Sequence, residues 1–138
     1  MLFSPAQAES NLTKDLSFDL GVSVGCFGVC LNYDVAVSDK LDIGGTTTVL
    51  LVMNSFALYA QYELLSGVRS LIYIEPSVGS IISPISREIT YGGELSLGWE
   101  GSLDDTRFFH VQAGGGGIYD LEEVVFWPDI RFGIGTRL

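Results

Sequence analysis

The chain has 138 residues, a formal net charge of −10 at pH 7 and an apolar content of 47%, and this length predicts one domain. Seven basic residues against seventeen acidic ones disfavour nucleic-acid binding, because such binding depends on neutralising phosphates. The mean hydropathy is +0.36, yet no apolar run reaches the roughly 18 residues of a membrane helix. The apolar side chains are therefore distributed in short alternating runs.

The first eight residues end in Ala6-Gln7-Ala8, a pattern typical of the cleavage end of a secretory signal peptide. We expect residues 1–8 to be a signal-peptide remnant and residues 9–138 to form a single domain that reaches a periplasm or the cell exterior. A chance match to the cleavage pattern is the alternative.

Residues 16–24 alternate between apolar side chains on one face and small or polar ones on the other, and residues 29–38 do the same. Two such runs around a short glycine-containing turn predict a hairpin. Cys26 and Cys30 would lie at its tip, where an oxidising compartment would allow a disulfide. The alternative is a pair of small hydrophobic side chains, and metal binding is disfavoured because no histidine lies nearby.

The next segments continue this pattern with one ambiguity. Residues 39–45 predict a turn, because they combine polar residues with glycine. The run 46–53 is apolar or β-branched on both faces, so the sequence does not assign its facing. Asn54 and Ser55 predict a tight turn, and residues 56–64 alternate again as a strand.

Further along, Ser66 and Gly67 predict a turn into a strand at 68–75. Residues 76–87 hold two of the four prolines and predict the longest loop, because proline removes a donor from the sheet ladder. Residues 88–100 follow as a clearly alternating strand with its charges on one face only.

The remaining segments lead to the end of the chain. Residues 101–106 predict a polar turn, and residues 109–113 a strand that runs into the four glycines 114–117. We interpret these glycines as bent or bulged strand, because a phosphate-binding loop needs a following helix and usually a lysine. An acidic loop at 119–123 precedes the closing strand, 124–138.

The last nine residues have apolar side chains at even positions, apart from Thr136, and only arginine or glycine at odd ones. We expect Arg131 and Arg137 to point inward and the apolar face to point outward. The pattern as a whole gives eight candidate strands, most of them near the 9–11 residues that a tilted strand needs to cross a bilayer. The expected outward residues of the closing strand are Ile130, Phe132, Ile134 and Leu138.

The chain resembles the small eight-stranded outer-membrane barrels, the OmpA and OmpX class, over roughly residues 15–138. Arg131, Gly133, Thr136 and Leu138 are similar to the assembly signal of that class, whose chains usually end in an aromatic residue. The resemblance implies an all-β fold, an antiparallel up-and-down eight-stranded transmembrane β-barrel in the bacterial outer membrane. It also implies contact with membrane lipid and with the outer-membrane assembly machinery, and it leaves oligomer formation open.

In such a barrel the polar face lines an interior just wide enough for side chains. Buried charges must pair there, so we expect a salt-bridge network that plugs the lumen, with an ion or proton path as the alternative. Arg131 and Arg137 are expected to face acids on the first and seventh strands. The expected network comprises Asp19, Asp34, Glu63, Arg69, Glu94, Glu100, His110, Arg131 and Arg137.

No pattern indicates an enzyme. His110 is the single histidine, and a catalytic histidine needs a nucleophile and an orienting acid. The residue two positions after it is Gln112, where a hydrolase of the outer membrane would carry a serine. We therefore predict no catalytic, cofactor or metal site.

The sequence thus predicts a small outer-membrane barrel of structural or unassigned role. One alternative is a secreted all-β domain that assembles into a fibre or binds a partner. Another is a lipocalin-like barrel, whose apolar faces would point inward around a small ligand. Exposure of the apolar faces would favour the membrane interpretation, and their convergence on an interior would exclude it.

Overall fold

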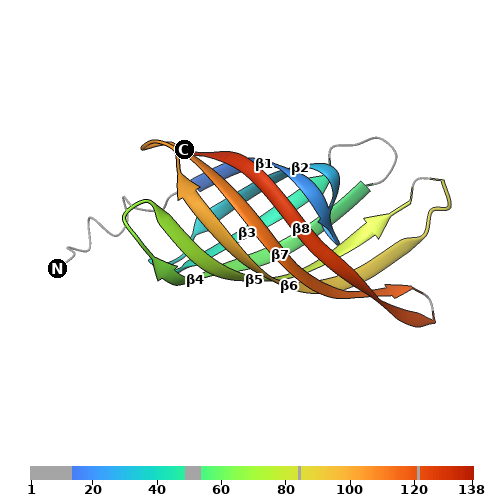
Figure 1. The fold of residues 1–138 in the computed structure, drawn as a ribbon. Helices are drawn as coiled ribbons and strands as arrows, with labels where there is room; N and C mark the ends of the chain where they lie inside the picture. The colour runs from blue at the N-terminus through green and yellow to red at the C-terminus, as the bar shows by residue number, and fades with distance from the viewer. Residues whose placement is uncertain (1–13, 49–53, 84, 121) are drawn as a thin grey trace.

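The computed structural model describes residues 14–48, 54–83, 85–120 and 122–138. Eight antiparallel strands form one closed barrel, in which each strand pairs with its neighbour in the sequence and β1 pairs with β8 (Figure 1). The predicted fold class is confirmed. The strands are β1 (Lys14–Ser23), β2 (Cys26–Ala36), β3 (Leu41–Thr48), β4 (Asn54–Ser66), β5 (Ser70–Ile82), β6 (Ile89–Ser102), β7 (Arg107–Asp120) and β8 (Glu123–Arg137).

The expected signal-peptide remnant, residues 1–8, lies outside the described residues and stays a prediction. Most of the ambiguous run 46–53 also lies outside them. Its first residues do have an assigned facing, since Thr46 and Thr48 are buried and Thr47 is exposed. Within the described ranges, no helix is long and apolar enough to span a membrane.

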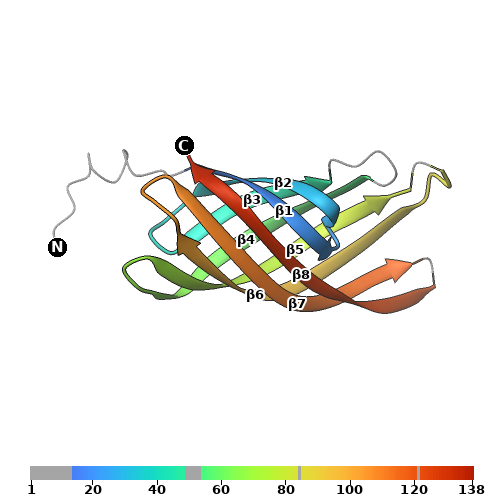
Figure 2. The ribbon, with the colours of Figure 1, turned by 45° about the horizontal axis from the view of Figure 1, so that its top comes forward.

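The two ends of the barrel carry different parts of the chain (Figure 2). At the terminal end β1 begins and β8 ends, and the Leu138 N–H donates to the Lys14 carbonyl over 2.7 Å. The β2–β3, β4–β5 and β6–β7 connections lie at this same end. The opposite end, which we call the distal end, carries the β1–β2, β3–β4, β5–β6 and β7–β8 connections.

The exterior of the barrel is apolar all the way round. The alternation that the sequence shows places one residue in two on the outside of each strand, and these side chains are large and exposed. Phe18 is 58% exposed, Leu97 55% and Ile134 61%. The members of this exterior belt include Phe18, Leu20, Val29, Ile43, Leu58, Val78, Leu95, Leu97, Val111, Ile130, Phe132 and Ile134.

Aromatic side chains flank the exterior belt near both ends of the strands. Transmembrane barrels carry girdles of aromatic residues at the two membrane interfaces, and the exposed aromatic residues here have that distribution. Those toward the terminal end are Tyr33, Tyr62 and Trp99, and those toward the distal end are Phe56, Tyr91, Tyr119 and Phe126.

The predicted loop at 76–87 is wrong over its first half, because β5 continues to Ile82. Pro76 is accommodated within this strand by an interruption of the ladder. It lies opposite Leu95 of β6, whereas the pairing with β4 passes from Ser77 to Ile74 and leaves the proline out. A residue without an N–H group costs no hydrogen bond at such a gap.

The predicted position of the first hairpin tip is also wrong. Ser23 pairs with Cys26, so the turn is Val24–Gly25, and Cys30 lies well inside β2. The strand coils tightly here, because the Cα atoms of the two cysteines are only 5.6 Å apart, whereas four residue steps of extended strand span about 13 Å. Gly28, with a φ of 95°, takes the left-handed conformation that this coil requires.

Candidate functional site

The inward positions of the barrel are mostly polar, in contrast to the exterior. Side chains of this kind are buried along every strand, and several carry a formal charge. An eight-stranded barrel has room inside for side chains and little else, so these groups must satisfy one another. The buried polar residues are Ser17, Asp19, Ser23, Asn32, Thr46, Thr48, Ser55, Glu75, Ser77, Glu94, Ser96, Glu100, Gln112, Asp129 and Arg131.

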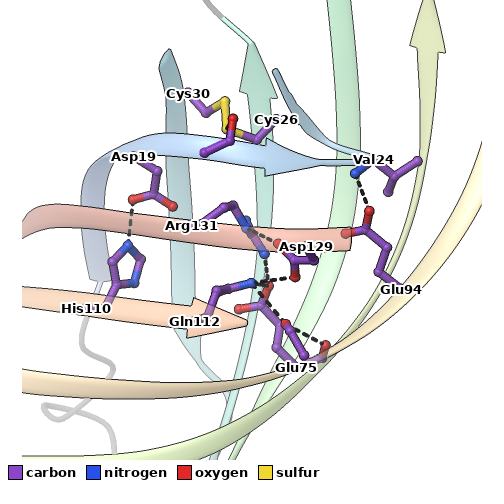
Figure 3. A network of polar contacts seen from close by, with 12 residues as sticks. Asp19, Val24, Cys26, Cys30, Glu75, Glu94, His110, Gln112, Asp129 and Arg131 are labelled. Atoms are coloured by element: carbon purple, nitrogen blue, oxygen red, sulfur yellow. Dashed lines mark hydrogen bonds and ion pairs between the residues drawn. A yellow bond between two sulfur atoms is a disulfide. The ribbon is translucent and has the colours of Figure 1, made fainter. Parts of the chain in front are cut away.

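Arg131 of β8 lies at the centre of the lumen and is 2% exposed (Figure 3). Its guanidinium forms a salt bridge with Glu75 across the barrel on β5. Its Nε also contacts Asp129 Oδ1 on its own strand, at 3.3 Å. A buried charge is tolerated only when it is paired and hydrogen-bonded, and two carboxylates meet that condition here.

Gln112 of β7 connects this ion pair to the surrounding strands (Figure 3). Its amide nitrogen lies 3.0 Å from Asp129 Oδ2, 3.3 Å from Glu75 Oε1 and 2.9 Å from the Ser96 hydroxyl. Its amide oxygen accepts a hydrogen bond from the Tyr73 hydroxyl at 3.3 Å. The central cluster, made of Tyr73, Glu75, Ser96, Gln112, Asp129 and Arg131, therefore links β5, β6, β7 and β8.

Asp19 of β1 and His110 of β7 form a second pair, with 2.5 Å between Asp19 Oδ1 and His110 Nε2. They meet across Gly133 of β8, which pairs with both strands at this level. A Cβ atom on Gly133 would stand 1.9 Å from Asp19 Oδ1 and 2.6 Å from His110 Nε2. Glycine is required at this position because the two side chains occupy the space that any larger residue would need.

The terminal half of the lumen is acidic. Arg137 pairs with Glu100 at 2.6 Å, and its guanidinium carbon lies 5.2 Å from the centre of the Phe108 ring. The Tyr59 hydroxyl donates to Asp34 Oδ2 at 2.8 Å. The half-buried carboxylates Asp15, Asp34, Asp42 and Glu63 lie at the same terminal end of their strands.

The distal half of the lumen is closed by apolar packing instead. A cluster of inward side chains packs there, and the Phe27 and Trp127 rings meet at an angle of 59° with 5.2 Å between their centroids. Glu94 accepts a hydrogen bond from the Val24 backbone N–H at the border of this cluster. Cys26 and Cys30 are joined by a disulfide beside it (Figure 3). The distal cluster consists of Val24, Ala57, Ile81 and Ile118, and it places Val24 inside, where the alternation of 16–24 had assigned it to the outer face.

Most of the residues expected in the charge network point into the lumen, but Arg69 does not. Arg69 is exposed in the β4–β5 connection, because β5 begins only at Ser70 and the alternation assumed for 68–75 does not extend to it. Glu63 is half-buried at the terminal end. The lumen contains Asp19, Asp34, Glu94, Glu100, His110, Arg131 and Arg137.

The expected partners of the two arginines are wrong. Both were expected to face acids on the first and seventh strands, but Arg131 binds Glu75 of β5 and Arg137 binds Glu100 of β6. The physical reason is reach, since the long Arg131 side chain crosses the narrow lumen to β5 and that of Arg137 passes over β7 to β6. Asp19 of β1 instead pairs with His110 of β7.

The sequence interpretation missed Asp129 and the lumenal tyrosines. Asp129 is fully buried. The sequence could have predicted this, because Asp129 lies an even number of residues from Arg131 and Arg137 and so points to the same face of the strand. Tyr59 and Tyr73 are 6% and 0% exposed. Both lie on the polar face of their alternating strands, but the sequence interpretation did not assign them to the lumen.

The lumen does not hold an arrangement for covalent catalysis, or three converging metal-ligating side chains, in the part of the chain that the structure describes. His110 is hydrogen-bonded to Asp19, and no described serine, threonine or cysteine side chain is hydrogen-bonded to its ring. Among the same residues, no three His, Cys, Asp or Glu side chains converge as metal ligands. The arrangement can pair charges, fill the interior and hold a water-sized particle in a cavity of about 10 Å³.

The fold matches those of solved membrane barrels. The N-terminal β-barrel domain of Pseudomonas aeruginosa OprF shares 16% identity, with 92% of this chain and 96% of that one covered at a TM-score of 0.61. Neisserial surface protein A shares 10%, with 92% and 96% covered at 0.61. The Yersinia pestis outer membrane protein Ail, in a phospholipid bilayer nanodisc, shares 10%, with 93% and 100% covered at 0.52.

No protein-family model matches the sequence, and no curated protein sequence matches it as a relative. The likeness at these low identities concerns the fold alone. That fold, with its buried ion pairs, is the one of the small eight-stranded outer-membrane β-barrels. The lipocalin-like alternative is wrong, because the apolar faces point outward and the interior is polar and filled.

Proposed function

We propose that this protein resides in the bacterial outer membrane as a structural barrel whose lumen is plugged by paired charges and apolar packing. The observation that carries the proposal is the exterior belt, an unbroken ring of exposed apolar side chains around a barrel with a polar interior. Lipid can contact such an apolar surface without desolvating polar groups. The closed ladder of inter-strand hydrogen bonds pairs the backbone N–H and C=O groups inside the bilayer.

The exterior belt favours a membrane over a secreted, freely soluble state. Soluble monomers rarely expose contiguous apolar patches larger than a few hundred Å². Here large apolar side chains from all eight strands are exposed together, and aromatic residues flank them at both ends. A secreted protein with this surface would have to bury it in a fibre or another assembly.

Two barriers in series support a plugged lumen. The central cluster crosses the barrel from Arg131 to Glu75, and the distal cluster closes the barrel beyond it. The cavity beside the central cluster measures only about 10 Å³, which holds one water molecule. A continuous path for hydrated ions would require both barriers to move.

The remaining parts of the proposal follow from this location. Membrane lipid is the partner of the exterior belt, and the outer-membrane assembly machinery inserts the barrel, for which Arg131, Gly133 and Thr136 supply the internal signal. The segment 1–8 would be what remains of a secretory signal. The proposed role is structural, and in it His110 pairs with Asp19 inside the lumen.

Membrane extraction tests the location. Cells that express the full chain are fractionated, and the protein should be recovered from the outer membrane only with detergent. The folded barrel should also run differently from the boiled protein on gels. Recovery as a soluble monomer without detergent would overturn the proposal, and recovery as a soluble assembly would favour the secreted alternative.

Planar-bilayer recording tests the plug. The refolded protein should give no stable conductance steps under conditions where a general porin, as positive control, conducts. Regular steps of uniform size from the protein would show an open path and would contradict the plugged lumen, while leaving the location unaffected.

A further inference from the structure

A cavity of about 10 Å³ lies in the lumen between side chains of β1, β2 and β4 to β8, and two buried oxygen atoms beside it have no hydrogen-bond partner among the described residues. These atoms are Asp19 Oδ2 and Asn32 Oδ1. Both residues are 2% exposed and both line the cavity. Asp19 lies opposite Cys30 and Asn32 opposite Ser17, so the two side chains are diagonal neighbours on the inner face of the first hairpin.

The other polar atoms of these two side chains are already engaged. Asp19 Oδ1 contacts His110 Nε2 at 2.5 Å, and the Asn32 amide nitrogen donates to the Ser17 hydroxyl at 2.9 Å. The two remaining oxygens are both acceptors, so neither can satisfy the other. A buried acceptor without a partner is costly, and a water molecule or a cation in the cavity would satisfy both oxygens.

The charges around the cavity favour a cation. Its lining carries four carboxylates, from Asp19, Asp34, Glu75 and Glu100, against Arg131 and His110. The Arg131 guanidinium is taken by Glu75 and Asp129, and Glu100 is paired with Arg137. Asp34 receives only the neutral Tyr59 hydroxyl. The balance is negative, and a low dielectric surrounding makes an uncompensated charge expensive.

We propose that the lumen binds one small monovalent cation, sodium in the first instance, between Asp19 Oδ2 and Asn32 Oδ1. Ser17, Asp34 and Gln61 line the same cavity and supply further oxygen atoms. A water molecule would satisfy the two acceptors but would leave the negative balance in place. Calcium takes six to eight oxygen ligands and magnesium a near-ideal octahedron, and no described group of three carboxylates or imidazoles converges to hold either ion.

Thermodynamic linkage tests the site in the full chain refolded in detergent. Urea unfolding is followed in sodium chloride and in N-methyl-D-glucamine chloride at equal ionic strength, since the second cation is too large for the cavity. Sodium should raise the ratio of folded to unfolded protein saturably, by about tenfold at about ten times its dissociation constant. Equal curves in the two salts would overturn the proposal.

A matched pair of variants assigns the effect to the cavity. Asn32→Leu removes the orphan oxygen at the site, whereas Asn54→Leu makes the same change at an exposed position at the start of β4. The sodium effect should be lost in Asn32→Leu and kept in Asn54→Leu. A sodium effect that survives Asn32→Leu would place the ion elsewhere and contradict the assignment.

Thallium diffraction on the unaltered protein decides the matter if Asn32→Leu does not fold. Thallium replaces monovalent cations and gives an anomalous peak, which should lie between Asp19 and Asn32. Ordered water in the cavity without such a peak would overturn the proposal. The inference depends on the closed lumen and not on the membrane, so its failure in a protein that still requires detergent would leave the proposed function intact.

Discussion

The two halves of the lumen solve the same packing problem in opposite ways. The distal half is filled by Val24, Ala57, Ile81 and Ile118, with a disulfide alongside. The terminal half is filled by carboxylates, tyrosine and one arginine, Arg137. Both halves lie inside the same strands, so strand alternation alone does not distinguish them. The difference shows that the alternation of a strand determines which side chains point into the lumen. Contacts with side chains of other strands determine how those side chains are stabilised.

Arg131 marks the border between the two halves. The apolar side chains of the distal cluster need no counter-charge, because they gain by leaving water. The terminal half contains several acids, and their tolerance depends on arginine, histidine and hydroxyl partners. The variants below perturb the border first, then the distal half, then the terminal half, and last a turn outside the lumen.

Arg131→Ala should have the largest effect. It leaves Glu75 and Asp129 buried without their counter-charge, and breaking a buried pair in this way costs about 3–5 kcal/mol. Urea unfolding of the refolded barrel measures the loss. Arg107→Ala is the matched control, since Arg107 pairs with Asp104 at the surface and is 67% exposed, and it should change the unfolding curve little.

Neutralising the partners tests whether the loss comes from unpaired charge. Arg131→Met combined with Glu75→Gln and Asp129→Asn removes the charges together. This triple variant should recover part of the stability lost in Arg131→Ala, because replacing a whole buried network is far less costly than removing one member. A triple variant less stable than Arg131→Ala would show that the cluster acts mainly through packing.

Ile118→Ala should come next, because it opens a cavity in the distal cluster, where Ile118 is 7% exposed. Truncating a buried isoleucine costs about 2–5 kcal/mol. Val111→Ala on the same strand is the control, since Val111 is 46% exposed on the exterior belt. The two unfolding midpoints should differ clearly, and equal midpoints would mean that the distal half is not a packed core.

Gly133→Ala should have a smaller but specific effect on the terminal side. Its Cβ would collide with Asp19 and His110, and overpacking of this kind costs about 1–3 kcal/mol. The control is Gly93→Ala, where the nearest atoms to a Cβ lie at 3.5 and 3.8 Å. The His110 imidazole resonance in NMR spectra should shift in Gly133→Ala and stay in place in Gly93→Ala.

Asp104→Asn should have the smallest effect, and the size of that effect should depend on pH. The Thr106 N–H, followed by the Arg107 side chain and N–H, lowers the pKa of Asp104 from its usual 3.8. The pKa of Asp104 is lower in the folded state than in the unfolded state. Its ionised carboxylate therefore stabilises the fold at a pH above the unfolded-state pKa, and this stabilisation is lost as the pH falls through the folded-state pKa. The difference from the unaltered protein should be constant between pH 5 and pH 8 and shrink below about pH 4. A difference that appears only above pH 5 would contradict this assignment.

Much of the fold could be predicted from the sequence because strand alternation is local. The facing of Phe18, Leu97 and Ile134 follows from their own neighbours in the chain, and all three are exposed as expected. Continuation through Pro76 could not be predicted in this way, since it depends on a gap in the pairing with another strand. The tight coil at Gly28 also depends on contacts that no local pattern displays.

The candidate site was predictable in part for the same reason. Strand alternation correctly placed Asp19, Glu100 and Arg131 inside the barrel, but the partners predicted for the arginines were wrong. A residue's parity is fixed by its own strand, whereas its partner is fixed by the stagger of eight strands around the barrel and by the reach of its side chain. Asp129 and the tyrosines show the same limit, because their importance arises only from what lies opposite.

The order of residues specifies a chain of alternating strands with one apolar and one polar face, because a two-residue period is local to each strand. Barrel closure then places the apolar face on the outside. It also decides which charges meet, where the apolar plug lies, and that Asp19 and Asn32 share a cavity. These properties depend on closure, which brings together residues far apart in the chain.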